Sequence, residues 1–213
     1  MKIKLVLPED EPDYFRHARI ETLKSIHEDF DPQLVNVPPI AFSFLAYDDH
    51  SDWPVGLAEI TFHEQVYSSH EEGPYPRSCD LGRFCEFSQM AGIRTIFVEP
   101  EYRGKAASIY LQLVMAGAKV VSALGAKYGT ATTHWNNRYL RGLYAKTGGT
   151  EMGPFRMDGV SSADLALFVF SIDGLLQHRL MKRATAQTVF DLDPAIARTI
   201  RSRSLVEREP LCA

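Results

Sequence analysis

The chain has 213 residues, of which 45% are hydrophobic and 23% are charged, and its formal net charge is −4. This length suits one sizeable domain with its own hydrophobic core, with room for a short extension. The mild negative charge disfavours a nucleic-acid-binding surface, which would be basic. The three cysteines, Cys79, Cys85 and Cys212, show no metal-ligand spacing, so we expect reduced thiols and a cytoplasmic location.

Neither a leader nor a membrane span is expected. The apolar run at residues 3–7 is too short for a signal peptide, and Pro8 and the acidic residues after it close the run. The longest mostly apolar stretch, 106–126, contains Gln112 and Lys119. It is typical of a buried helix rather than of a membrane-spanning one.

Strands and helices are expected to alternate along the chain. Apolar runs predict strands at 3–7, 41–47, 55–62, 93–98, 130–133 and 165–172, with one more near 153–158. Apolar spacings of three and four predict helices from the acidic cluster 9–13 to Phe30, over 106–127 with Gly129 as the stop, and over 137–147. More helix follows Asp173, and another helix opens at Asp193-Pro194.

This order predicts an α/β (α+β) domain, with a mixed central sheet and helices on both faces. We place the domain at 1–175. Residues 176–213 are expected to be a helical C-terminal extension, either an element of a homodimer or a tail.

The polar segment 63–92 has no sustained apolar period, and loops of this length are usually functional or disordered. Its acidic groups, with Asp80 and Glu86, are expected to line the site of a cationic acceptor. The pairs His63-Glu64 and His70-Glu71 do not have the spacing of a zinc site, so we expect no metal.

The turn at 101–108 leads directly into the predicted helix at 106–127. The first turn of a helix presents unpaired N–H groups and the positive end of the helix dipole. Small residues at this position, with Arg103 and Lys105 beside them, suit a phosphate, although an exposed polar cap is the simpler interpretation of the turn alone.

Asn137 and Tyr144 lie seven residues apart, so they share one face of the next predicted helix. Asn137 is placed to cap that helix, and Tyr144 is either a core aromatic or a hydroxyl able to protonate a thiolate.

Taken together, the segment from Val98 to Gly149 resembles the GNAT acyltransferase superfamily. The first stretch reads Val98-Glu99-Pro100-Glu101-Tyr102-Arg103-Gly104-Lys105-Ala106-Ala107-Ser108, against a family pattern V-x-P-x-x-R-G-x-G-x-G/A. The second runs from Asn137 through Tyr144 to Gly148-Gly149, against N-x6-Y-x-x-x-G-F/Y. The strand-helix-strand-helix order between them also fits.

The resemblance implies an N-acyltransferase that moves an acetyl or other acyl group from acyl-CoA to a small-molecule primary amine. It implies that the backbone of Ile96, Phe97 and Val98 contacts pantetheine, and that Asn137 binds the pantetheine or adenosine part. Residues of the turn would hold the pyrophosphate: Arg103, Gly104, Lys105, Ala106, Ala107 and Ser108. Tyr144 would be the general acid for the departing thiolate.

Two alternatives stay open because Ala106 and Ser108 stand where the family usually has glycine. One is an N-acyl amino acid or homoserine lactone-type synthase that takes its acyl group from acyl carrier protein and needs no strong pyrophosphate loop. The fragment Asp80-Leu81-Gly82-Arg83-Phe84 partly resembles the E-x-S-R-F motif of autoinducer synthases. The other is a non-catalytic CoA-binding module.

The general base is also open. Many family members hold a carboxylate five residues before the asparagine, and here that residue is Thr132. His134 shares a strand face with Thr132 and is one candidate, and Glu59, inside an apolar strand, is another.

Overall fold

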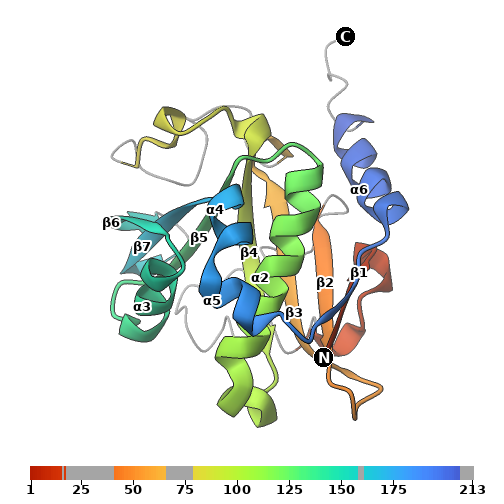
Figure 1. Ribbon diagram of the computed structural model, residues 1–213. Helices are drawn as coiled ribbons and strands as arrows, with labels where there is room; N and C mark the ends of the chain where they lie inside the picture. Colours follow the sequence, from red (N-terminus) through yellow and green to blue (C-terminus); the bar gives the residue numbers. More distant parts are fainter. Residues whose placement is uncertain (16, 18–40, 66–78, 158–160, 207–213) are drawn as a thin grey trace.

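A computed structural model describes residues 1–15, 17, 41–65, 79–157 and 161–206 (Figure 1). These residues form a single eight-stranded mixed sheet, in the order β6-β7-β5-β4-β3-β2-β1-β8. The strands are β1 (Lys2–Val6), β2 (Phe42–Tyr47), β3 (Pro54–Phe62), β4 (Met90–Val98), β5 (Tyr128–His134), β6 (Thr150–Met157), β7 (Ser161–Ser171) and β8 (Val189–Asp191). The helices are α2 (Ala106–Ala123), α3 (Arg138–Lys146), α4 (Ile172–Gln177), α5 (Arg179–Ala184) and α6 (Pro194–Val206).

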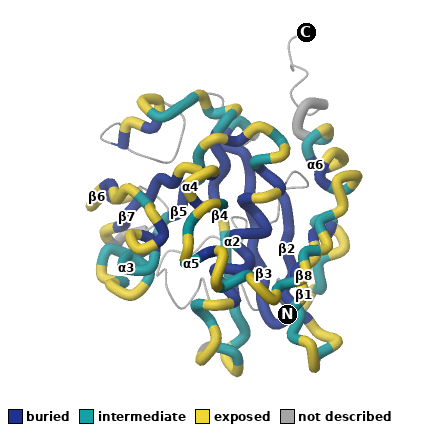
Figure 2. The backbone as a smooth tube through the Cα atoms, in the orientation of Figure 1, coloured by how far each residue is buried: buried dark blue, intermediate teal, exposed yellow. Residues whose placement is uncertain are grey.

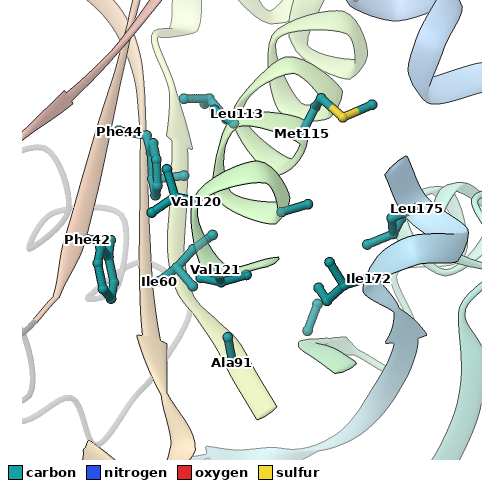
Figure 3. Packing of buried hydrophobic residues seen from close by; sticks show 14 of the residues in the cluster. Phe42, Phe44, Ile60, Ala91, Leu113, Met115, Val120, Val121, Ile172 and Leu175 are labelled. Atoms are coloured by element: carbon teal, nitrogen blue, oxygen red, sulfur yellow. The ribbon is translucent and has the colours of Figure 1, made fainter. Parts of the chain in front are cut away.

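One face of the sheet carries the main core. Side chains alternate across a strand, so every second residue points toward α2. Phe42, Phe44 and Ile60 do so and pack with the buried face of α2 (Figure 3). The strands at the centre of the sheet are accordingly buried along most of their length, while exposed residues gather on the outer helices and turns (Figure 2).

The helix α2 is long and apolar enough to cross a membrane, and among the described residues it alone passes that test. However, 61% of the helix is buried inside the molecule. It packs on β2, β3 and β4 and is also contacted by α4 and α5. This is the arrangement of a core helix.

The opposite face of the sheet is covered by shorter pieces. Helical backbone begins at Asp13, and Phe15 packs there with Leu57 and Phe97. The rest of the helix predicted to reach Phe30 lies outside the described residues. Over β7, the same face is covered by the segment that contains Cys79 and Leu81.

Several predicted boundaries were wrong. The helix α2 ends at Ala123 rather than at residue 127, because Gly125 takes a φ of 95° that favours glycine and breaks the helix. Ala126 N–H then reaches back to the Val121 carbonyl at 2.9 Å. Gly129, predicted as the helix stop, lies instead in β5.

The strand β4 starts at Met90, three residues before its predicted start, so the end of the supposed loop 63–92 is part of the sheet. The segment 79–89 contains two short 3-10 helices, Leu81–Arg83 and Phe87–Gln89. Its buried Leu81 shows that this part of the loop packs on the sheet rather than standing off it.

The C-terminal extension includes a strand that was not predicted. β8 pairs in parallel with β1, at the edge of the sheet, and α6 lies beside β1 (Figure 1). The helix α6 opens at Pro194, as predicted. Residues 207–213 lie outside the described part.

Candidate functional site

The central feature is a fork between β4 and β5. These strands pair in parallel only where Met90–Gly92 meet Tyr128–Thr130. Beyond this point β5 stays paired with β7 as far as His134, while β4 stays paired with β3 as far as Val98. Within the described residues, the β4 segment 93–98 therefore has no strand neighbour on its β5 side, and its edge backbone groups there can pair with an extended ligand.

A bulge in β4 lies at this fork. Glu59 of β3 is opposite Thr95, but the next residue, Ile60, is opposite Ile93, so Arg94 is the extra residue. Because of this extra residue, the side chains of β4 before the bulge alternate out of phase with those after it. Of the predicted carrier-binding residues, Ile96 and Val98 pack toward the α2 core, whereas Phe97 packs on the opposite face.

At its open end, β4 leads into the predicted phosphate turn. Residues Pro100–Lys105 form a 3-10 helix that includes Arg103 and Gly104, and α2 starts at Ala106. No side chain caps the first turn of α2 and no acidic residue lies in it. Ala106 and Ala107 are half-buried there, and their small side chains leave room for an anion to approach the backbone.

Two polar residues of this turn have protein partners. Lys105 Nζ lies 3.7 Å from Asp48 Oδ2, in the loop between β2 and β3. Ser108 Oγ accepts a hydrogen bond of 3.2 Å from Gln112 Nε2. The same Gln112 amide donates to the carbonyl of Ala184, which places the end of α5 beside the first turns of α2.

Tyr144 lies on the α2 side of the fork. It is 5% exposed and packs edge-on against Phe168 and Phe170 of β7, with ring centroids 5.0 and 5.9 Å away. Tyr110 of α2 donates a hydrogen bond of 2.8 Å to its hydroxyl oxygen. Asn137 caps α3 through its side-chain oxygen, which accepts from Leu140 N–H at 3.0 Å, and this cap fixes the start of the helix that carries Tyr144.

Burial dominates the acidity of both tyrosines. It raises the pKa of Tyr110 well above the ordinary value, and the interaction with Tyr144 adds to this rise. Burial also raises the pKa of Tyr144, although the hydrogen bond from Tyr110 offsets part of the effect. Of the two hydroxyls, Tyr144 thus has its oxygen already hydrogen-bonded and its own proton available to donate.

The two candidate bases lie on the other face of the sheet. Glu59 is 4% exposed and sits beside Thr95, at the bulge. His134 is half-buried at the end of β5, on the far side of the fork. Because β4 and β5 run parallel, the register brings His134 level with about the middle of the unpaired β4 segment, and the two candidates flank the fork.

Sequence reasoning missed two residues near the fork. His63, considered only as a metal ligand, is 3% exposed, and its Nε2 lies 2.9 Å from Thr130 Oγ1, where β4 and β5 separate. A side chain at Gly92 would meet the same ring, at 3.0 Å. The other is Tyr110, which the sequence does not distinguish from the other residues on the apolar face of α2. Its hydrogen bond with Tyr144 depends on how α2 and α3 pack.

The acidic residues expected at the acceptor site, Asp80 and Glu86, are both exposed on the segment 79–89. Phe84 of the Asp80–Phe84 fragment packs on Tyr128 of β5, with ring centroids 5.5 Å apart. His70 and Glu71 lie outside the described residues. Within the described part, no three His, Cys, Asp or Glu side chains gather in a way that could hold a metal ion.

An apolar cavity of about 40 Å³ begins at the closed end of the fork. It lies between α2, the paired ends of β4 and β5, and the segment from the end of β7 to α5. Both Tyr110 and Tyr144 line it.

Comparison with known proteins identifies the fold. No protein-family model matches the sequence. No curated protein matches it either. Solved structures do match in fold: FeeM, an N-acyl amino acid synthase from uncultured soil microbes, superposes with a TM-score of 0.57 at 13% identity, over 85% of this chain and 96% of that one.

Two N-acetyltransferases are also similar. The enzyme from Staphylococcus aureus Mu50 gives a TM-score of 0.53 at 16% identity, over 80% of this chain and 97% of its own. A chimera of the Vibrio cholerae spermidine N-acetyltransferase SpeG with hSSAT gives 0.53 at 13% identity, over 83% of this chain and all of its own. The predicted mixed-sheet fold of the GNAT type is thereby confirmed; at these identities the likeness concerns the fold.

Proposed function

We propose that this chain, which has the fold of GNAT N-acyltransferases, transfers an acyl group from a thioester carrier to a primary amine of a small molecule. The observation that carries the proposal is the fork between β4 and β5, with a tyrosine hydroxyl on one of its faces and two candidate bases on the other. An extended thioester arm fits the unpaired edge of residues 93–98 as an added strand.

The direction of β4 supports a particular orientation of the carrier. The phosphate end would lie at the open end of the fork, at Arg103–Ser108, where the uncapped first turn of α2 begins. The arm would then run back along Val98, Phe97 and Ile96 toward the bulge. Asn137, on the other side of the fork, would contact the same arm from the start of α3.

The chemistry uses both faces. Glu59 or His134 takes the proton of the incoming ammonium, so that the neutral amine attacks the carbonyl carbon; the new C–N bond forms and the C–S bond breaks. The hydroxyl of Tyr144 donates a hydrogen bond to the departing sulfur, which leaves as a thiolate. The ammonium nitrogen loses two protons in all: the base takes the first and later releases it to solvent, and the second passes to the departing thiolate. The products are an amide, the free thiol carrier and one proton.

We propose acetyl-CoA or another acyl-CoA as the donor, with the reaction in the cytoplasm. Acyl carrier protein is the second candidate, and one observation favours it. The end of α5 lies against the first turns of α2 through Gln112 and Ala184, and so narrows the space that a nucleotide would need. Ala106 and Ser108, in place of glycines, narrow it further. A homodimer through the C-terminal extension also remains a proposal.

A thermal-shift panel tests the donor. A ligand at about a hundred times its Kd stabilises a protein by about 2.7 kcal/mol, which is readily detected. We expect acyl-CoA to raise the Tm of this protein and Arg103→Ala to reduce that shift, with Lys146→Ala, an exposed lysine of α3, as the control. If acyl carrier protein gives the shift and CoA does not, the second donor is the correct one.

Release of free thiol in the presence of a panel of primary amines then tests catalysis. Binding of CoA without thiol release with any amine would favour a non-catalytic CoA-binding module. If neither carrier binds, the proposed function is wrong.

A further inference from the structure

The cavity at the closed end of the fork is built almost wholly of apolar side chains. Those of α2, β3 and β4 form one wall and those of the β7–α5 segment form the other. In Figure 3, Ile172 and Leu175 lie across from Val121 and Ala91, with the cavity-lining face of α2 beside them. The cavity meets the edge of residues 93–98, along which the carrier arm is proposed to run, at Ile93.

The tyrosine hydroxyls at the cavity are hydrogen-bonded to each other. Tyr110 donates to the Tyr144 oxygen at 2.8 Å, which leaves only the Tyr144 proton for a ligand. Thr147 Oγ1 donates to the carbonyls of Leu143 and Tyr144. Apart from the Tyr144 proton, which is assigned to the departing sulfur, the described residues that line the cavity offer a polar ligand group no partner to replace its hydration, so the cavity favours hydrocarbon.

The cavity is also in line with the donor. A carrier arm that enters at α2 and runs along β4 toward its start presents its thioester near the bulge and points its acyl tail to the closed end of the fork. Ala91, Gly129 and Thr130, at that closed end, are cavity residues. The acyl tail would therefore pass the two tyrosines and enter the cavity.

We propose that this cavity is an acyl-chain subsite, and that the donor carries a straight acyl chain longer than acetyl. The proposal rests on the proposed function. A cavity needs roughly 10–15 Å³ to hold one water-sized group, so about 40 Å³ accommodates about three such groups beyond the thioester. This corresponds to an acyl chain of about four carbons, counting the carbonyl carbon. Each further buried methylene should tighten binding about fourfold until the cavity is full.

Ala118 of α2 provides the test. It lines the cavity and is 3% exposed, so Ala118→Leu places three more carbons in that space. Dissociation constants would be measured for the saturated acyl-CoA series from acetyl to decanoyl and, in parallel, for the same acyl groups on acyl carrier protein. In the unmodified protein we expect affinity to rise from acetyl to about butanoyl and to level off beyond it. Ala118→Leu should lose about tenfold with butanoyl while keeping its affinity for acetyl.

Two further variants complete the design. Ala123→Leu makes the same change at an exposed position of α2 and should leave the chain-length profile unaltered. Leu175→Ala enlarges the cavity from α4, away from the sheet, and should move the optimum to longer chains; it keeps the test decisive if Ala118→Leu does not fold.

The outcomes separate the two proposals. Equal affinity for acetyl and longer chains, unchanged by the cavity variants, would overturn the acyl-chain subsite and leave the acyltransferase function standing. If no thioester of any length binds on either carrier, both the function and the subsite are wrong.

Discussion

At the scale of single residues, the hydrogen bonding and the acidity of the Tyr144 hydroxyl depend on its neighbour Tyr110 and on burial. Tyr110 donates to the Tyr144 oxygen at 2.8 Å, which leaves the Tyr144 proton free to point at a ligand. Because burial raises the pKa of Tyr144 above its ordinary value, this hydroxyl is a weaker acid than a thiol, whose pKa is about 8.5. Tyr144 should therefore stabilise the departing thiolate mainly as a hydrogen-bond donor rather than by complete proton transfer.

We expect Tyr144→Phe to lower kcat roughly 10- to 150-fold, the equivalent of about 1.5–3 kcal/mol for a hydrogen bond to a charged group. Tyr110→Phe is the matched control, since it removes the same tyrosine–tyrosine hydrogen bond but keeps the hydroxyl that faces the ligand. Steady-state kinetics with a saturating amine would compare the two. Equal losses in both variants would make Tyr144 a structural aromatic.

The two candidate bases can be told apart by pH rescue. A base is needed only while the acceptor amine is protonated, and an alkylamine resembles a lysine side chain in losing its proton near pH 10.4. We expect His134→Ala or Glu59→Gln, whichever removes the base, to lower kcat/KM at pH 7 and to recover as the pH approaches 10. Tyr144→Phe should not recover in this way. If neither base variant differs from the unmodified protein at pH 7, neither residue is the base, and His63 becomes the residue to test.

At the scale of elements, the contact between α2 and β3 positions the helix over the fork. Gly117 of α2 faces Ile60 of β3 so closely that an added Cβ would lie 2.0 Å from the Ile60 Cδ1 atom. The helix can therefore approach the sheet this closely without displacing Ile60, because Gly117 has no side chain. The same close approach brings Tyr110, two turns earlier on α2, toward Tyr144.

Gly117→Ala is expected to destabilise the protein by about 1–3 kcal/mol, because overpacking outweighs the gain of about 1 kcal/mol in helix propensity. Ile60→Val removes the Cδ1 atom that the new methyl group would meet. In that background Gly117→Ala should therefore cost much less, and urea unfolding of the four proteins would give the coupling energy. Additive effects would show that Ile60 does not limit the approach of α2.

At the scale of the whole molecule, the C-terminal segment contacts the N-terminal segment. β8 pairs with β1, and Arg203 of α6 donates two hydrogen bonds, of 2.9 and 2.6 Å, to Glu9. These bonds to Arg203 are the main reason that the pKa of Glu9 falls to about 2. The two side chains remain partly exposed, 31% for Arg203 and 51% for Glu9, so solvent screens the pair.

A lowered carboxylate pKa stabilises the fold at pH values above 4.5, and that contribution is lost as the pH falls from 4.5 to about 2. We expect Arg203→Gln to cost at most about 1 kcal/mol at pH 7 and low salt. Chemical unfolding of both proteins should show this difference shrinking toward zero near pH 2 and in high salt. A difference that is constant with pH would mean that Arg203 acts through packing.

The sequence by itself determined the parts of this protein that depend on local patterns. The order of strands and helices, the small-residue turn into α2 and the Asn137 cap follow from apolar periodicity and from the chemistry of helix ends, which act over a few residues. The GNAT-type fold followed because those local patterns occur in one characteristic order. The element boundaries were not determined in this way. Either Gly125 or Gly129 could adopt the φ that ends a helix, and in the structure it is Gly125 that does so.

Only the tertiary structure decided how distant residues meet. The separation of β4 from β5 beyond Gly92 and Thr130, the bulge beside Glu59 and the pairing of β8 with β1 depend on strand register, which no single strand encodes. The Tyr110–Tyr144 hydrogen bond and the apolar cavity depend on how closely α2, α3 and α4 approach the sheet. That distance is set by side-chain volumes on several elements at once, with Gly117 against Ile60 as the clearest case, and so it becomes visible only when the elements are packed.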